Sequence, residues 1–345
     1  MAVRVGVIGT GTIGRDHIRR LTRTLSGSRV VAVNDIDAGL AEKVAARLPG
    51  DVRTHGTADG LIADDAVDAV VVCSWGPAHA EQVLAAVAAG KPVFCEKPLA
   101  TTRADCLRIV EAEVAAGRRL VRVGYMRRYD PAYRELKRVV DAGAIGAPLM
   151  MHCVHRNAGV PAFYEPDSTI TDTAVHEMDV TRWMFGEEIT TVTVLRGRRN
   201  RHSGDIDDPL LVLLQTESGI LVDVEISVNI RYGYDIRCEV VGEDGTAALG
   251  DTAPVTVRLD RGITGRVPAD YRERFAEAYD REFQSWLDEL RSDLHGSGHT
   301  DHDGDRGPSA WDGYAASAVS DATLTAARTG SRIAVQLAPR PALYG

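Results

Sequence analysis

Residues 3–14 read V-R-V-G-V-I-G-T-G-T-I-G, and this stretch decides the fold of the first part of the chain. The β-branched run at its start predicts a buried strand, and a helix pattern opens at its end. Glycines between a strand and a helix permit a tight turn and a close approach of the backbone to a pyrophosphate, which the helix N-terminus binds. The expected cofactor-binding residues in this turn are Gly9, Gly11, Thr12, Ile13 and Gly14.

The same alternation of strand and helix patterns continues to about residue 125. Further strand-like runs start near residues 29, 67, 92 and 119, and helix-like stretches cover 13–25, 79–89 and 103–116. Gly90 and Gly117 end the last two helices. Strands separated by helices form parallel sheets with crossover connections. We therefore predict a doubly wound α/β domain over residues 1–125.

A different pattern follows a linking helix at 130–142. Residues 221–241 alternate, with Val222, Val224 and Ile226 on one face and charged residues on the other. Such a strand has one buried face. The pattern predicts an α+β domain over residues 126–345, with a large, mostly antiparallel open sheet covered by helices on one face. Late helices are expected at 271–294 and 309–329. The polar face of the sheet could be solvated or could pack against another subunit.

Composition indicates an ordinary globular chain of 345 residues with 44% hydrophobic residues and a net charge of -9. Its compact basic run, Arg196–Arg201, is expected at an exposed strand end or hairpin loop, and no nucleic-acid partner is predicted. No apolar stretch approaches the roughly 18 residues that cross a bilayer, so no membrane partner and a cytoplasmic location are expected. Five widely spaced cysteines suit reduced core thiols.

Asp35 ends the second predicted strand, about twenty residues after the glycine turn. A carboxylate at this position accepts hydrogen bonds from the adenosine ribose and repels a 2'-phosphate. The interpretation is NAD rather than NADP. The alternative is that Asp35 only caps the next helix.

Two more predicted strands end in polar segments, at residues 73–79 and 94–98. Ligands of open α/β sheets bind at the carboxyl ends of the strands. Lys97 is the most informative of these residues, because an ammonium there can donate to a reacting oxygen and stabilise negative charge. The alternative is a surface lysine. The expected cofactor-lining residues here are Ser74, Trp75, His79, Glu96 and Lys97.

Asp172, His176 and Asp179 stand at i, i+4 and i+7 in the segment D-T-A-V-H-E-M-D. In an α-helix this spacing places all three on one face, and Trp183 continues the stripe, which predicts an inward face. Two acids beside a histidine suit proton transfer, although they could equally cap or pair locally. A zinc site is not expected, because the second histidine of a zinc-binding helix is missing.

Glu96-Lys97-Pro98 after a dinucleotide-binding half, followed by Asp172 and His176, resembles the Gfo/Idh/MocA family of sugar and polyol dehydrogenases over nearly the whole chain. Within that family, several segments resemble the bacterial inositol 2-dehydrogenases. They are G-T-G-T-I-G-R-D-H, S-W-G-P-A-H, C-E-K-P-L-A-T-T, G-Y-M-R-R-Y-D, D-T-A-V-H-E-M-D-V-T-R-W, Y-G-Y-D-I-R-C-E-V-V-G-E-D-G and P-S-A-W-D-G-Y-A-A.

The resemblance implies a Rossmann domain followed by an α+β domain, a cis bond before Pro98, and a homotetramer formed through the open sheet face. It also implies site residues. The catalytic group would be Lys97, Asp172, His176 and Asp179. Near the substrate would lie Arg127, His155, Asn157, Thr173 and Tyr234, with Arg127 also beside the cofactor.

The implied reaction is NAD-dependent oxidation of myo-inositol to 2-keto-myo-inositol, with His176 as general base supported by Asp179. Lys97 would hold the reacting oxygen and Asp172 a neighbouring hydroxyl. Another cyclitol, an aminocyclitol precursor or an aldose remains open as substrate, and so does a non-catalytic NAD-binding sensor.

The segment 295–307 is rich in Gly, Asp and His and departs from the family pattern as an insertion. It predicts a flexible loop. Its histidines, His295, His299 and His302, are not expected to form a functional metal site, because no packed framework surrounds them in the sequence pattern.

Overall fold

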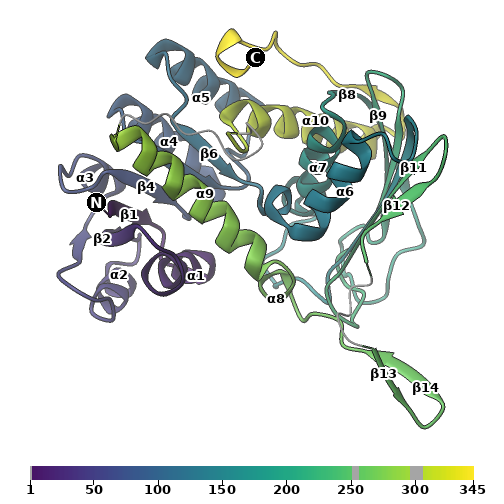
Figure 1. Cartoon of the computed structure of the whole chain (residues 1–345), viewed down its shortest axis with the longest axis horizontal. Helices are drawn as coiled ribbons and strands as arrows, with labels where there is room; N and C mark the ends of the chain where they lie inside the picture. The colour runs from purple at the N-terminus through teal and green to yellow at the C-terminus, as the bar shows by residue number, and fades with distance from the viewer. Residues whose placement is uncertain (1, 251–255, 296–305) are drawn as a thin grey trace. The chain divides into compact units, whose positions relative to one another are not determined.

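A computed structural model describes residues 2–250, 256–295 and 306–345 of the protein. The chain divides into two compact units (Figure 1). The first contains residues 1–125, 279–317 and 338–345, and the second contains 126–278 and 318–337. The sequence predicted one uninterrupted domain from residue 126 onward. The structure differs, because the chain returns to the first unit twice.

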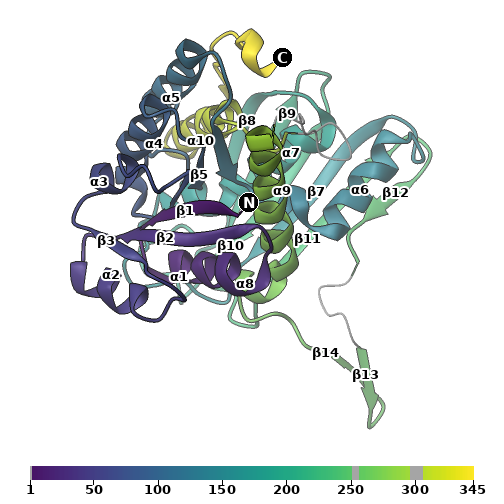
Figure 2. The ribbon, with the colours of Figure 1, turned by 60° about the vertical axis from the view of Figure 1, so that its left-hand side comes forward.

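The described residues of the first unit form a parallel sheet in the order β3-β2-β1-β4-β5-β6. Helices α1 and α2 lie on one side of it, and α3, α4 and α5 lie on the other (Figure 2). This is the predicted doubly wound arrangement. The strands are β1 Val3–Ile8, β2 Ser28–Asn34, β3 Arg53–His55, β4 Ala69–Val72, β5 Val93–Glu96 and β6 Val121–Gly124. The helices are α1 Thr12–Arg19, η1 Arg20–Thr24, α2 Ala38–Ala45, α3 Ala58–Ile62, η2 Gly76–Ala78, α4 His79–Ala88, α5 Arg103–Ala116 and η5 Ala342–Tyr344.

Two local features of this unit differ from the sequence patterns. Strand β3 was not predicted, because its three residues are partly or fully exposed and carry no apolar alternation. The expected helix over 13–25 is an α-helix only to Arg19 and continues as a π-helical turn, η1. Helix α5 matches its predicted range and ends at Gly117, which has φ 69°, a left-handed conformation that suits glycine.

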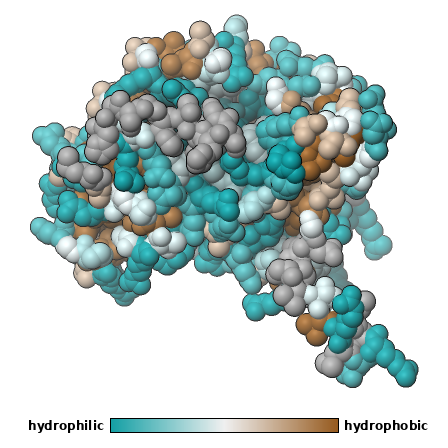
Figure 3. Space-filling view, viewed as in Figure 1, coloured by the Kyte–Doolittle hydropathy of each residue, from teal (hydrophilic) through white to brown (hydrophobic). Residues whose placement is uncertain are grey.

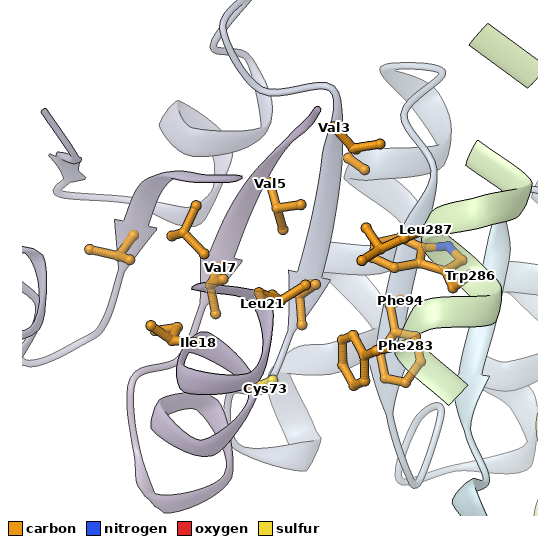
Figure 4. Close-up of a cluster of buried hydrophobic side chains, with 14 of the residues drawn as sticks. Val3, Val5, Val7, Ile18, Leu21, Cys73, Phe94, Phe283, Trp286 and Leu287 are labelled. Carbon is orange, nitrogen blue, oxygen red and sulfur yellow. The ribbon is translucent and has the colours of Figure 1, made fainter. Parts of the chain in front are cut away.

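Helix α9, Ala276–His295, explains why the chain returns to the first unit. Its apolar residues Phe283, Trp286 and Leu287 are at most 2% exposed and join the core formed by β1, β4, β5 and α1 (Figure 4). The rings of Phe94 and Phe283 lie 4.1 Å apart between centroids. Aromatic side chains bury large apolar areas, so this face of the sheet is closed by a helix from late in the sequence.

The second unit contains a larger sheet in the order β12-β11-β7-β10-β9-β8-β15. Among its described strand pairs, β10–β7 is parallel and the others are antiparallel, so the sheet is mostly antiparallel, as predicted. Its strands are β7 Pro148–Arg156, β8 Ile189–Arg196, β9 Leu210–Thr216, β10 Leu221–Ser227, β11 Asp235–Gly242, β12 Thr246–Ala248 and β15 Ile333–Ala334, while β13 Thr256–Leu259 and β14 Gly262–Gly265 form a separate two-stranded sheet. Its helices are η3 Met126–Tyr129, α6 Pro131–Asp141, η4 Thr169–Ala174, α7 Val175–Phe185 and α8 Tyr271–Arg274. Helix α10, Ala310–Thr329, crosses from the first unit into the second after Ser317.

Helices α6 and α7 lie on one face of this sheet (Figure 1). Along β10 the residues Val222, Val224 and Ile226 are buried and the ones between them are partly exposed, as the alternation predicted. The alternation does not continue to residue 241, because a loop with Arg231 at φ 77° separates β10 from β11.

Several smaller predictions concern the surface and the backbone. All five cysteines are buried and free. The basic run begins at the exposed end of β8, where Arg196 and Arg199 pair with Asp207. The Lys97–Pro98 bond is cis, as the resemblance implied. Of the predicted flexible loop, residues 296–305, including His299 and His302, lie outside the described residues, and His295 ends α9.

The face of the molecule in Figure 3 is mainly hydrophilic, with hydrophobic residues in scattered patches. Across the described ranges, none of the helices combines the length and the apolar character that a membrane span requires.

Candidate functional site

The glycine turn between β1 and α1 forms a cradle with open space at one position. A Cβ on Gly9, where φ is +90°, would lie 2.5 Å from the backbone of Cys73, and a Cβ on Gly14 would lie 2.0 Å from the Gly9 carbonyl oxygen. A Cβ on Gly11 would meet nothing within 4 Å. Gly11 is the N-cap of α1, where Thr12 and Ile13 begin the helix without a side-chain cap. The free N–H groups and the open space fit the pyrophosphate of a dinucleotide.

Asp35 is tied to this turn by hydrogen bonds. Its Oδ2 accepts from the Thr10 backbone N–H at 2.6 Å and from Thr10 Oγ1 at 2.8 Å. Burial alone would raise the pKa of Asp35, but these hydrogen bonds lower it below the ordinary value. The residue that caps α2 is Asp37, whose side chain accepts from the Leu40 N–H. Asp35 is therefore an ionised carboxylate beside the turn, and it is not the cap of the next helix.

The loop after β4 presents one exposed aromatic side chain and one buried histidine. Trp75 is 81% exposed, and Ser74 Oγ donates to Gln82 Oε1 at 2.6 Å. His79 is buried, with Nδ1 at 2.8 Å from the Pro98 carbonyl oxygen and Nε2 at 3.0 Å from the Ser74 carbonyl oxygen. Since both ring nitrogens meet backbone oxygens, His79 joins two loops. That His79 lines the cofactor site stays a prediction.

Glu96 is the last residue of β5, and Lys97 follows it. Glu96 Oε1 lies 2.7 Å from His17 Nε2, and Glu96 Oε2 accepts from the Lys97 backbone N–H at 3.1 Å. Burial alone would raise the pKa of Glu96, but the hydrogen bond from His17 lowers it. Both carboxylate oxygens of Glu96 therefore have partners in the protein, while Lys97 itself is only partly buried.

In the second unit, the predicted helical trio is divided between two helical segments. Asp172 lies in the π-helical turn η4, and His176 and Asp179 lie in α7. The prediction of one α-helical face for all three was wrong, because a π turn closes between residues i and i+5 and changes the angle at which Asp172 projects. Helix α7 is also buried nearly all round, whereas Trp183 on the predicted inward stripe is only half-buried.

Two consecutive arginines of η3 hold α7 in place. Arg127 forms an ion pair with Glu177, and Arg128 donates two hydrogen bonds to Asp179, the one from Nε at 2.9 Å. All four side chains are at most 7% exposed. Burial alone would raise the pKa of Glu177, but the Arg127 guanidinium lowers it to about 2. Buried charges require such pairing. The two ion pairs therefore hold helix α7 at the positions that directly follow His176.

His155, on β7, extends this network toward His176. Its Nδ1 lies 3.0 Å from both Glu177 Oε2 and Arg127 Nη2. The ring centroids of His155 and His176 are 6.3 Å apart, and the Tyr234 ring meets His155 edge-on at 5.7 Å. Burial raises the pKa of Tyr234 to about 12, so its hydroxyl remains a neutral donor. The structure thus brings four of the predicted site residues together.

Asn157 and Thr173 complete the predicted set in this unit. Asn157 is held through its backbone, which donates to Ser227 and accepts from Ile230. Its Oδ1 is buried and has no hydrogen-bond partner among the described residues, so it can accept a hydrogen bond from a ligand. Thr173 Oγ1 lies 2.7 Å from the Tyr164 hydroxyl.

The first unit has a glycine turn with a nearby carboxylate. The second unit has a buried array of histidine, arginine, tyrosine and amide groups. Together these features indicate a nucleotide-dependent oxidoreductase of polar substrates. Residues 3–125 match the family model described as the oxidoreductase family with an NAD-binding Rossmann fold, and residues 133–248 match the GFO/IDH/MocA C-terminal domain. The chain belongs to the Gfo/Idh/MocA family and is an NAD-dependent oxidoreductase.

Full-length relatives agree with this assignment. The chain is 53% identical over 346 residues to inositol 2-dehydrogenase 3 of Saccharopolyspora erythraea, covering 100% of this chain and 99% of the relative. It is 50% identical to inositol 2-dehydrogenase of Pseudomonas fluorescens, with both chains covered completely. Among solved structures, myo-inositol dehydrogenase from Lactobacillus casei in complex with NAD(H) and myo-inositol aligns at a TM-score of 0.94 with 36% identity, covering 100% of both chains.

Sequence reasoning did not identify His17, Arg128 or Glu177. Arg128 and Glu177 each stand next to a predicted site residue in the sequence. The available signal was that one of these segments carries positive charges and the other carries negative charges. His17 follows the glycine turn by three residues, but nothing local indicates a partner at Glu96.

We expect Glu177→Gln to destabilise the protein by roughly 3–5 kcal/mol at pH 7, because it leaves the buried Arg127 guanidinium unpaired. The pKa of Glu177 is about 2 in the fold against an ordinary value of 4.5. Its contribution is therefore present above pH 4.5 and is lost as the pH falls from 4.5 toward 2. Urea denaturation of the wild type and of Glu177→Gln should show a difference in the free energy of unfolding that shrinks as the pH falls through this range.

The matched control is Glu135→Gln, which removes the acid of an exposed pair with Arg138 in the same unit. It should leave the unfolding free energy unchanged within error. A Glu177→Gln effect that stays constant between pH 7 and pH 3 would contradict the assigned ionisation.

Proposed function

We propose that this protein oxidises myo-inositol at a secondary ring alcohol to give 2-keto-myo-inositol. The observation that carries the proposal is the buried polar array around His176. It occurs in a chain that is 53% identical to an inositol 2-dehydrogenase over its full length. Myo-inositol carries a hydroxyl on every ring carbon, so its binding requires many donors and acceptors in a small space. Arg127, His155, Asn157 and Tyr234 supply both kinds.

When bound, NAD supplies the hydride acceptor at C4 of its nicotinamide ring. The residues proposed to bind it are those of the first unit that fit a dinucleotide. The turn containing Gly9, Gly11 and Gly14 would bind the pyrophosphate, and Asp35 would accept hydrogen bonds from the adenosine ribose. The low pKa of Asp35 supports this role, because an ionised carboxylate also repels the 2'-phosphate of NADP.

The proposed proton acceptor is His176. As the alcohol C–H electron pair leaves the carbon, the O–H proton passes to the imidazole and the C–O bond becomes a carbonyl. Lys97 would donate a hydrogen bond to the reacting oxygen, and Asp172 would hold a neighbouring hydroxyl. Asp179 would support the imidazolium by its charge while Arg128 holds its position.

Purified protein should form NADH with myo-inositol, and Lys97→Ala and His176→Ala should each lower kcat by roughly 10²–10⁴-fold, the range for loss of a proton-transfer group. The measurement is NADH absorbance with myo-inositol, scyllo-inositol, glucose and an aminocyclitol. Lys43→Ala and His202→Ala, at exposed positions of the same residue types, are the controls and should keep wild-type rates.

Unchanged turnover in either site variant would refute the role given to that residue. If another compound of the panel gives a higher kcat/KM, that compound and not myo-inositol is the preferred substrate. NAD binding without turnover on any polyol would favour a sensor.

The selectivity for NAD is expected to depend on Asp35. Wild-type protein should have a kcat/KM with NAD at least tenfold above that with NADP, and Asp35→Ala should remove most of this preference. Asp37→Ala, which loses only the cap of α2, should keep the preference. Equal kcat/KM values for the two cofactors in the wild-type protein would refute the assignment.

We further propose that the protein is a homotetramer assembled through the outer face of the large sheet. This face carries partly exposed apolar side chains on its central strands, including Met150 and Val154 of β7 and Leu211 and Leu213 of β9. Between them on the same face stand the ion pairs His152–Asp223 and Arg156–Glu225, so apolar and charged groups are mixed, as they are in many subunit interfaces.

Sedimentation equilibrium should therefore give about four times the chain mass of 37.2 kDa. Leu213→Glu should shift the protein to smaller species, because a charge would be buried at the interface. Val114→Glu, at an exposed position of α5, is the control and should leave the mass unchanged. A monomeric wild-type protein would refute this proposal.

A further inference from the structure

Two histidines hold the turn formed by Glu96, Lys97 and Pro98, and the proposed reaction uses neither of them. His17 comes from α1 and reaches the turn through the Glu96 carboxylate. His79 comes from the start of α4 and reaches it through the Pro98 carbonyl oxygen. Lys97 is the residue between these two attachments.

The contact from His17 has a defined direction. Arg20 Nη1 lies 3.0 Å from His17 Nδ1, and a guanidinium can only donate, so Nδ1 accepts. The proton of the neutral ring is therefore on Nε2, which donates to Glu96 Oε1 at 2.7 Å. Arg20 is itself held by Asp16 at 2.9 Å and by Asp280 at 2.6 Å. The orientation of His17 is thus determined by a chain of charged partners.

His17 is also excluded from direct chemistry by its burial. Its side chain is 0% exposed, and its ring lies among Phe94, Tyr279 and Phe283 at centroid distances of 6.3, 5.6 and 4.5 Å. A ring enclosed in this way cannot reach a ligand. What it can do is hold Glu96, whose other oxygen accepts the Lys97 backbone N–H at 3.1 Å.

The contact from His79 acts at the other end of the turn. Nδ1 lies 2.8 Å from the Pro98 carbonyl oxygen, and Nε2 lies 3.0 Å from the Ser74 carbonyl oxygen. The side chain is 2% exposed. Both carbonyl oxygens only accept, so the ring makes both hydrogen bonds with a proton on each nitrogen and one of them with a single proton. In either state the buried ring lies between the turn and the loop after β4, where Ser74 and Trp75 lie.

We propose that His17 and His79 are positioning residues for Lys97, acting through the backbone on either side of it. The inference rests on the role proposed for Lys97. A lysine side chain is long and flexible, so the place of its ammonium depends on the backbone from which it extends. A displacement of about 1 Å at a reacting group can lower the rate by about 10²-fold.

The test compares two substitutions at His17. Glutamine retains an amide N–H that can donate to Glu96 and a carbonyl oxygen that can accept from Arg20, whereas leucine has neither. We expect His17→Leu to lower kcat by about 10–100-fold with a small change in the Kd for NAD, measured by quenching of protein fluorescence. His17→Gln should recover kcat to within about fivefold of wild type.

A double-mutant cycle with Lys97 separates positioning from a general loss of stability. If His17 acts through Lys97, His17→Leu should have no further effect on the residual kcat of Lys97→Ala. Equal fold-losses in both backgrounds, or equal kcat for His17→Leu and wild type, would overturn the inference. His55→Leu, which breaks another histidine–carboxylate pair in the same unit, is the control and should keep the wild-type kcat.

His79→Leu provides an independent cycle, and it decides the question if His17→Leu does not fold. Its effect on kcat should also disappear in the Lys97→Ala background. Full activity of Lys97→Ala by itself would instead refute the proposed function of Lys97, so the two failures can be distinguished.

Discussion

The buried ion pairs between η3 and α7 are the constraint on which the second unit depends. Arg127 and Arg128 follow one another in the chain, and they meet Glu177 and Asp179, which stand two residues apart on one helix. Each charge is buried, so none is tolerable without its partner. Because Arg127 also contacts His155 of β7, this pairing joins α7, with His176, to β7 within the second unit.

The same principle operates in the first unit around Glu96. A buried carboxylate at the end of β5 has one oxygen satisfied by His17 and the other by the backbone of Lys97. Lys97, for which a ligand contact is proposed, thus follows a residue whose carboxylate is fully engaged within the protein. In both units the supporting contacts join segments distant in sequence, because a buried polar group must find its partner wherever the fold places one.

Much of the fold was predictable from short-range patterns. Except for β3, the strands of the first unit follow from β-branched runs, and helix α5 follows from helical spacing and a glycine stop; these signals are local. The return of α9 to the first unit was not predictable, since its amphipathic pattern shows that one face is buried but not against which sheet. The π-helical turn containing Asp172 was missed for a related reason. A spacing of i, i+4 and i+7 identifies a face only if the helix is α-helical throughout.

The sequence by itself predicted which residues would carry the chemistry, because residue types and motif spacing express it directly: the glycine turn, Asp35, Lys97 and His176 all follow from local patterns. The tertiary structure alone decided which contacts surround these residues. His79 lies between two loops, His17 contacts Glu96, and Glu177 contacts His155. The physical reason is that hydrogen bonds and ion pairs between distant segments form only after the chain has packed, and they leave no periodic trace in the sequence.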